Sequence, residues 1–324
     1  LSTATQPVLP NLGTIAEIVP PSAGLSRRLR RVRYTLPDVR ENKSRSWDEI
    51  AVELAQHRQI LCVVNTRRDC LELFGKMPPE TIHLSASMCG AHRSKIIEEI
   101  RRKLQAHEPI RVISTQLVEA GVDIDFPVVY RALAGLDSIA QSAGRCNREG
   151  NNPNGGKVVV FIPPKPAPMG QLRKAEDSAR ILLHETLDME NVEVFPRFFS
   201  EFYSRVEGRF PYEELLVRDA SRIQIQFRDA AARFHMIDET QQSMFVRYGA
   251  SEGLIGALQK QIRIDAPYGH LLRKLQRYTV SVAKSQFLKL KSNGLIEEFA
   301  PGMFVWNGMY SEATGAEIFN ESGL

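Results

Sequence analysis

The sequence predicts an α/β fold, a parallel sheet with helices on both faces, followed by a smaller α+β region. Strand-like and helix-like segments alternate between residues 46 and 163, a spacing that is typical of βαβ units. Residues 60–64, Ile-Leu-Cys-Val-Val, are apolar throughout, as in strands buried on both faces of a sheet. Four prolines within residues 163–168 then predict a stiff break between the two regions.

The elements of the first region follow in chain order. Ser46 and Glu49 have the spacing of a capping box, which predicts a helix that begins there and ends near His57. Further helices are expected over 68–76, 94–105 and 138–146, and strands over 60–64, 82–84, 110–114, 128–130 and 157–162. Residues 27–45 carry eight basic and two acidic side chains, which predicts either a nucleic-acid-binding arm or an edge strand protected from aggregation by its arginines.

Composition agrees with a two-domain globular chain of 324 residues. Residues 1–23 are expected to be mainly linker, 24–163 the first complete domain, 164–170 a Pro-rich linker and 171–324 the second domain. In the second domain we expect helices over 171–188 and 196–207 and strands near 244–246, 279–282 and 304–306.

Charge and cysteine content exclude several classes of protein. The net charge of +4 is too small to indicate a nucleic-acid partner by itself. The four cysteines form no CxxC pair and nothing resembles a signal peptide, so a reduced, cytoplasmic location is expected. No apolar run reaches the ~18 residues that a membrane span needs. The chain does not begin with Met, and we expect it to be a fragment of a longer protein.

Residues 112–150 contain the most informative pattern. Thr115 follows a predicted strand, and the carboxyl ends of parallel strands are where open α/β sheets bind ligands. Its hydroxyl and the following amides are able to donate to a phosphate, and Gly121 permits a close backbone approach. Arg145 and Arg148 are three residues apart, which on a helix places both guanidinium groups on one face, suited to a phosphate.

These segments resemble the second RecA-like domain of superfamily 2 helicases. Four motifs match in order and spacing: residues 1–5 as motif III at the end of the first RecA-like domain, 60–66 as motif IV, Thr115-x5-Gly121-x-Asp123 as motif V, and Gln141-x2-Gly144-Arg145-x2-Arg148 as motif VI. More specifically, the wording of 114–123 and 141–148 resembles the CRISPR-associated helicase-nuclease of type I systems, with subtype C the nearest in wording. The α+β tail is similar to the accessory C-terminal domain of that family.

The resemblance implies an activity and a set of partners. It implies ATP with Mg bound between two RecA-like domains, the first of them outside this chain, and movement along single-stranded DNA. It also implies an upstream histidine-aspartate nuclease domain, with its own metal, that degrades invading DNA opened by an RNA-guided surveillance complex.

The resemblance further implies roles for individual residues. Arg148 is expected to be the arginine finger and Arg145 the second catalytic arginine. The nucleotide-facing residues are expected to be Gly121, Asp123, Gln141, Arg145 and Arg148; the DNA-facing residues Asn65, Thr66, Thr115 and Gln116; and the coupling residues Ser2, Thr3, Ala4 and Thr5. Capping of the next helix stays an equal alternative for Asn65 and Thr66.

A second basic stretch lies in the predicted α+β domain. Residues 260–291 carry eight Lys or Arg and one acid, interleaved with aromatics, as a single-strand groove requires. Lys284, Lys289 and Lys291 are therefore candidate DNA contacts. The alternative is an amphipathic helix whose aromatics are buried.

The sequence also lacks features that a complete motor-nuclease needs. It contains no GxxxxGK[ST] loop, no motif II and no His-Asp dipeptide, and its histidines show no metal-ligand spacing. We therefore expect half of an ATP site, an inactive chain when isolated, and no metal site. The alternatives are another superfamily 2 DNA or RNA helicase and a free-standing, non-catalytic half-motor that serves as an interaction module.

Overall fold

The structure is a computed structural model. It describes residue 5 and residues 30–185, 187–189, 191, 193–206, 213–218, 220, 224–233 and 241–319. Nearly all of the expected linker at 1–23 therefore lies outside the described residues, and so do Ser2, Thr3 and Ala4. Thr5 is described, and it is buried.

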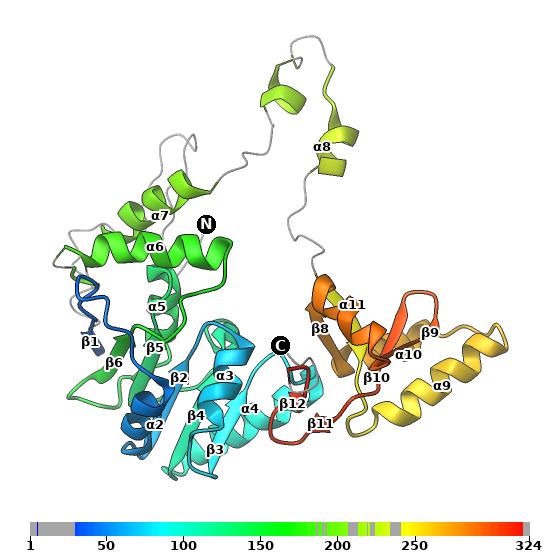
Figure 1. The fold of residues 1–324 in the computed structure, drawn as a ribbon, viewed down its shortest axis with the longest axis horizontal. Helices are drawn as coiled ribbons and strands as arrows, with labels where there is room; N and C mark the ends of the chain where they lie inside the picture. Colours follow the sequence, from blue (N-terminus) through cyan, green and yellow to red (C-terminus); the bar gives the residue numbers. More distant parts are fainter. Residues whose placement is uncertain are drawn as a thin grey trace.

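The first domain is built on a six-stranded sheet in which all strands are parallel, as predicted (Figure 1). Its strand order is β1-β6-β5-β2-β4-β3. The strands are β1 (Val32–Thr35), β2 (Gln59–Val63), β3 (Thr81–Leu84), β4 (Ile110–Ser114), β5 (Val128–Ala132) and β6 (Gly156–Phe161). β1 pairs with β6 at the edge, so the edge-strand interpretation of residues 27–45 is confirmed for the part that the structure describes.

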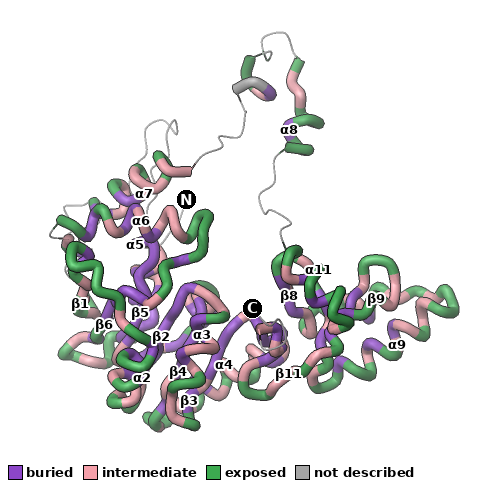
Figure 2. The backbone as a smooth tube through the Cα atoms, in the orientation of Figure 1, coloured by how far each residue is buried: buried purple, intermediate pink, exposed green. Residues whose placement is uncertain are grey.

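Helices cover both faces of this sheet, as predicted. α2 (Trp47–Ala55) and α3 (Arg67–Phe74) pack on the face that includes Ile60 and Cys62 of β2. α4 (Gly90–Gln105) and α5 (Leu136–Ala143) cover the opposite face, which includes Leu61 and Val63. Alternate residues of one strand thus enter two separate cores, and the strand is buried along its length (Figure 2). The predicted capping box of Ser46 is formed at the start of α2.

The Pro-rich segment is not a break in packing, which corrects the boundary expected at 164–170. α6 (Gln171–Leu183) and α7 (Val194–Arg205) follow it and return to the first domain, beside α5. Leu182 and Phe198 share one hydrophobic cluster with Ile139 of α5 and Val160 of β6. The prolines stiffen a surface connection, but the apolar faces of the two helices after it need a core and find it on α5.

The C-terminal region has its own four-stranded mixed sheet, of order β8-β7-β10-β9. Its strands are β7 (Gln241–Phe245), β8 (Thr279–Ala283), β9 (Ile296–Ala300) and β10 (Met303–Trp306), so the three expected strands are confirmed. Helices α9 (Ser251–Arg263), α10 (Gly269–Leu275) and α11 (Lys284–Ser292) accompany them, with the short turn η5 (Gln276–Tyr278). Two smaller pieces, η3 (Glu213–Val217) and α8 (Phe227–Arg233), lie apart from both sheets (Figure 1).

The last described segment returns to the first domain. It forms a small hairpin, β11 (Tyr310–Ser311) and β12 (Gly315–Ala316), next to the start of α4. The Tyr310 hydroxyl lies 3.0 Å from Nδ1 of the buried His92, and the Ala316 amide donates to the Ser87 carbonyl at 2.8 Å. The His92 ring also stacks on Tyr248, with 4.6 Å between centroids. Among the described helices, none is long and apolar enough to cross a membrane.

Candidate functional site

The motif V segment begins where β4 ends and crosses one edge of the sheet. Thr115 precedes the short turn η2 (Gln116–Val118), and Val122 and Ile124 are buried farther along. These apolar anchors leave Asp123 exposed between them. Gly121 has φ of +72°, and a Cβ there would meet nothing within 4 Å. The glycine is therefore required by the backbone turn and leaves open space at its surface.

The motif VI arginines are not on one helix face, which corrects the geometric argument from their spacing. α5 ends at Ala143, and the chain then bridges to Phe126, whose amide donates to the Arg145 carbonyl at 2.9 Å. Asn147, with φ of +47°, turns the backbone between the two arginines. As a result Arg145 is buried and Arg148 is exposed.

Arg145 ties motif VI to motif V. It is 8% exposed, and its guanidinium donates to the carbonyls of Val118 at 2.8 Å and Glu119 at 2.5 Å. Burial lowers the pKa of Arg145 from its ordinary value, and the neighbouring Arg148 acts in the same direction. In this arrangement Arg145 holds the turn after β4, and its contact with a phosphate stays a prediction.

Arg148 and Asp123 meet in space, as motif VI and motif V of one site should. Nε of Arg148 lies 2.9 Å from Oδ1 of Asp123, and both side chains are largely exposed. Such an exposed pair is worth only about 0–1 kcal/mol, so the guanidinium is readily released to another anion. Asp125 fixes the loop beneath them, because its carboxylate accepts the backbone N–H groups of Arg148 at 2.7 Å and Glu149 at 3.0 Å.

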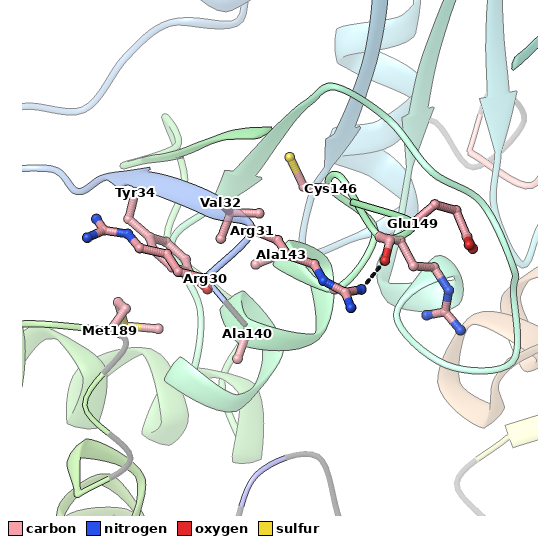
Figure 3. Close-up of a pocket in the computed structure, with 11 residues that line it drawn as sticks. Arg30, Arg31, Val32, Tyr34, Ala140, Ala143, Cys146, Glu149 and Met189 are labelled. Carbon is pink, nitrogen blue, oxygen red and sulfur yellow. Dashed lines mark hydrogen bonds between the residues drawn. The ribbon is translucent and has the colours of Figure 1, made fainter. Parts of the chain in front are cut away.

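A cavity of about 610 Å³ opens beside Arg148 (Figure 3). It lies between β1 and the end of α5, and Arg30, Arg31 and Tyr34 line its β1 side. Arg31 Nη1 donates to the Arg148 carbonyl, the dashed line in Figure 3. The sequence did not single out Arg31 as a site residue, although the basic run at 27–45 was a signal for it. The arginines give this cavity the charge that an anionic ligand needs.

The four predicted DNA-facing residues come together at the opposite, carboxyl edge of the sheet. β2 and β4 are neighbours, and the Gln116 amide donates to the Asn65 carbonyl at 2.7 Å. Thr66 caps α3 by accepting the Asp69 N–H at 3.0 Å, so the capping alternative is confirmed for Thr66. A contact of this edge with DNA stays a prediction.

The Asn65 side chain is buried rather than offered to solvent. Its Nδ2 donates to the Leu133 carbonyl at 2.8 Å, and its Oδ1 accepts from Arg131 at 2.7 Å. Its amide is thus part of an internal network that includes Arg131 and Glu119. Neither charged residue was singled out from the sequence; the available signal was the arginine within the otherwise apolar segment of β5, Val-Val-Tyr-Arg-Ala.

The other nucleotide and DNA candidates are placed as follows. Gln141 lies on α5, half-buried, and its amide has no hydrogen-bond partner among the described residues. Lys284 and Lys289 are exposed on α11, whereas Lys291 pairs with Glu298 at 2.7 Å. Phe287 of the same helix is buried, so for this aromatic the amphipathic-helix alternative is confirmed. Within the described part of the chain, no group of three His, Cys, Asp or Glu side chains is arranged to hold a metal ion.

The parallel sheet, its two helical layers and its smaller second sheet define a RecA-like domain with an accessory region. Residues 56–151 match the family model described as CRISPR-associated nuclease/helicase Cas3, C-terminal. The chain is 49% identical over 69 residues to the CRISPR-associated nuclease/helicase Cas3 of Haloferax volcanii, covering 21% of this chain and 7% of that protein. It is 30% identical over 112 residues to the protein of the same name from Methanothermobacter thermautotrophicus, covering 32% and 13%. This segment is thus similar to the C-terminal helicase part of Cas3 proteins.

Solved structures show the same fold over most of the chain. T. fusca Cas3 bound to ATP matches with a TM-score of 0.53 and 14% identity, covering 88% of this chain and 42% of that one. T. fusca Cas3 bound to AMPPNP matches with a TM-score of 0.51 and 13% identity over the same shares. At this identity the likeness concerns the fold. The chain spans less than half the length of these structures and a smaller share of the curated relatives.

Proposed function

We propose that this chain is the C-terminal helicase part of a CRISPR-associated nuclease/helicase of subtype C. In the complete protein it is half of an ATP-driven motor that moves along single-stranded DNA in the cytoplasm. An upstream histidine-aspartate nuclease with its own metal, and an RNA-guided surveillance complex that opens the DNA, complete the antiviral system. The similarity of residues 56–151 to Cas3 supports the family, and one observation supports the motor: Arg148 and Asp123 meet at 2.9 Å beside an arginine-lined cavity.

The residues at this end of the sheet fit an anionic nucleotide. Arg148 is exposed, has a weakly held carboxylate partner and borders the cavity that Arg30 and Arg31 also line. When bound between this domain and a first RecA-like domain, ATP with Mg supplies the phosphoryl group whose transfer drives the motor. Arg148 then leaves Asp123 and stabilises charge on that group, which is the role of an arginine finger.

Neighbouring groups position this arginine and read its state. Arg145 holds the motif V turn through two backbone carbonyls, and its remaining donors and Gln141 face the phosphates in the closed state. The open space at Gly121 lets the nucleotide approach the backbone, and Asp123 exchanges Arg148 for the nucleotide. Residues 2–5 link this domain to the preceding one.

The opposite edge of the sheet supplies the DNA contacts. Thr115, Gln116, Asn65 and Thr66 follow β4 and β2, where backbone N–H groups and hydroxyls are able to donate to phosphates. Lys284 and Lys289 of α11, with Lys291, extend the positive surface in the accessory region. Nucleotide and DNA therefore bind at different ends of one sheet, and a change at one end has to be transmitted to the other.

The test is ATP hydrolysis by the complete protein and by this chain alone, each with and without single-stranded DNA. The complete protein should show turnover that DNA stimulates. The isolated chain should show none, because it lacks the phosphate-binding loop and motif II. DNA-stimulated turnover by the isolated chain would disprove the half-site, and a complete protein without any turnover would favour an interaction module.

A further inference from the structure

A buried ion pair joins several segments of the first domain. Arg131 of β5 is 0% exposed, and its Nε lies 3.1 Å from Oε1 of Glu119, which follows η2. Nη1 donates to Asn65 Oδ1 at 2.7 Å and to the Ala132 carbonyl at 2.9 Å, and Nη2 donates to Ser138 Oγ at 2.8 Å. One guanidinium therefore connects β5, the loop after β2, the motif V turn and α5.

Glu119 makes as many contacts as its partner. Its carboxylate accepts from Ser138 Oγ at 2.7 and 2.8 Å and from Ser142 Oγ at 3.0 Å, both on α5. Its backbone carbonyl accepts from Arg145 at 2.5 Å. The side chain of Glu119 is thus bound to α5 while its main chain is bound to motif VI.

Stability alone does not explain such a pair. Removing two charges from water costs several kcal/mol per ion, and an apolar pair of similar volume is often as stable or more stable. Burial lowers the pKa of Arg131, with the Glu119 carboxylate acting in the opposite direction. What the charges provide, and apolar side chains do not, is a directional set of hydrogen bonds that fixes four segments relative to one another.

The contacts run from one end of the proposed motor to the other. At the carboxyl edge, Gln116 donates to the Asn65 carbonyl, and the Asn65 amide binds Arg131. Arg131 binds Glu119, whose main chain binds Arg145 of motif VI. All the residues between the two ends are buried or nearly so. This is a continuous polar path between the DNA-facing edge and the nucleotide-facing arginines.

We propose that Arg131 and Glu119 are a positioning pair that couples DNA at the carboxyl edge to the arginines of motif VI. The inference rests on the proposed function. Neither residue touches nucleotide or DNA; each acts through Asn65 and Arg145. Loss of the Glu119 charge should therefore leave each ligand's separate binding intact and remove the influence of one ligand on the other.

The experiment measures that influence as a coupling factor in the complete protein. The factor is the affinity for a fluorescent single-stranded DNA with a non-hydrolysable ATP analogue, divided by the affinity without it. We expect a wild-type factor of about 5 to 150, the ordinary range for coupled sites. Glu119→Gln should bring it close to one, with the separate affinities for DNA and analogue unchanged.

Glu176→Gln is the matched control. Glu176 is equally buried, with a side chain 1% exposed, and pairs with Arg180 at 2.9 Å, but it lies on α6 outside the path. This variant should lose stability and keep the wild-type factor. The double variant Glu119→Gln/Arg131→Met removes both buried charges, so its melting temperature should recover while its factor stays close to one.

Each outcome decides between explanations. A wild-type factor in Glu119→Gln overturns the positioning role alone. A factor that recovers together with the melting temperature in the double variant also overturns it, because the pair is then only structural. A wild-type protein with a factor of one overturns the proposed function, and the positioning role with it.

Discussion

The hairpin of β11 and β12 should be sensitive to a single methyl group at Gly315. Gly315 has φ of +83°, and a Cβ built there would lie 2.3 Å from the Ser87 carbonyl oxygen and 2.5 Å from the Ser87 carbonyl carbon. Both atoms belong to the backbone just before α4, so neither is able to swing away. Gly315→Ala should therefore push the hairpin off the first domain and strain the contact of Tyr310 with His92.

Gly294→Ala separates the clash from the backbone strain. Gly294 has φ of +75°, and a Cβ there would meet nothing within 4 Å. Alanine in the left-handed region costs about 1–2 kcal/mol at either position. Gly315→Ala should cost about 1–3 kcal/mol more, the usual penalty of overpacking. The difference corresponds to about 2–4 °C in melting temperature for each kcal/mol.

The assay is calorimetric melting of both variants, with limited proteolysis of the C-terminal region. We expect Gly315→Ala to melt several degrees below Gly294→Ala and to be cleaved faster after residue 306. Equal melting temperatures and equal cleavage would refute the docking of the hairpin against Ser87.

Three further predictions concern the site and the core. Arg145→Ala should lower the free energy of unfolding by about 1.5–3 kcal/mol for each charged hydrogen bond lost; an unchanged thermal melt would show that its two carbonyl contacts do not form. Charge reversal of Lys284 and Lys289 should reduce the slope of log affinity against log salt for single-stranded DNA by about 0.7 per phosphate contact, with Lys291 contributing less because it pairs with Glu298; an equal slope would leave them as ordinary surface charges. Burial lowers the pKa of His83 to about 4, so the folded state binds fewer protons than the unfolded state and stability should fall as pH drops from about 6.5 towards 4. His83→Leu should flatten this dependence in melts across that pH range, and an equally steep curve would assign it to other groups.

Local patterns predicted the elements of the first sheet because each depends on neighbouring residues. The Ser46 capping box and the apolar run of β2 are examples, and both lie where expected. The end of α5 was misplaced because it depends on a distant contact: the bridge of Phe126 to Cys146 turns the chain before the second arginine. No local rule shows that residue 126 will lie there.

The same limit explains the missed network and the misplaced boundary. Arg131 stands out within an apolar strand, but its partner Glu119 lies on another element, and only the fold brings the two together. Prolines at 163–168 correctly mark a connection. They do not show whether the helices after it dock back, which the apolar surface of Phe198 against α5 decides.

The arginine-finger role of Arg148 is tested most directly by DNA-stimulated ATP turnover of the complete protein with Arg148→Ala. Arg102→Ala is the control, because Arg102 is also an exposed arginine paired with a carboxylate, Glu108 at 2.8 Å, but lies on α4 away from motif VI. We expect turnover to fall by about 10³- to 10⁵-fold in Arg148→Ala, with unchanged melting and resting DNA binding. Arg148→Lys should restore little, because an ammonium lacks the planar two-pronged contact, and Arg102→Ala should match the wild type. Turnover close to wild type in Arg148→Ala would contradict the account.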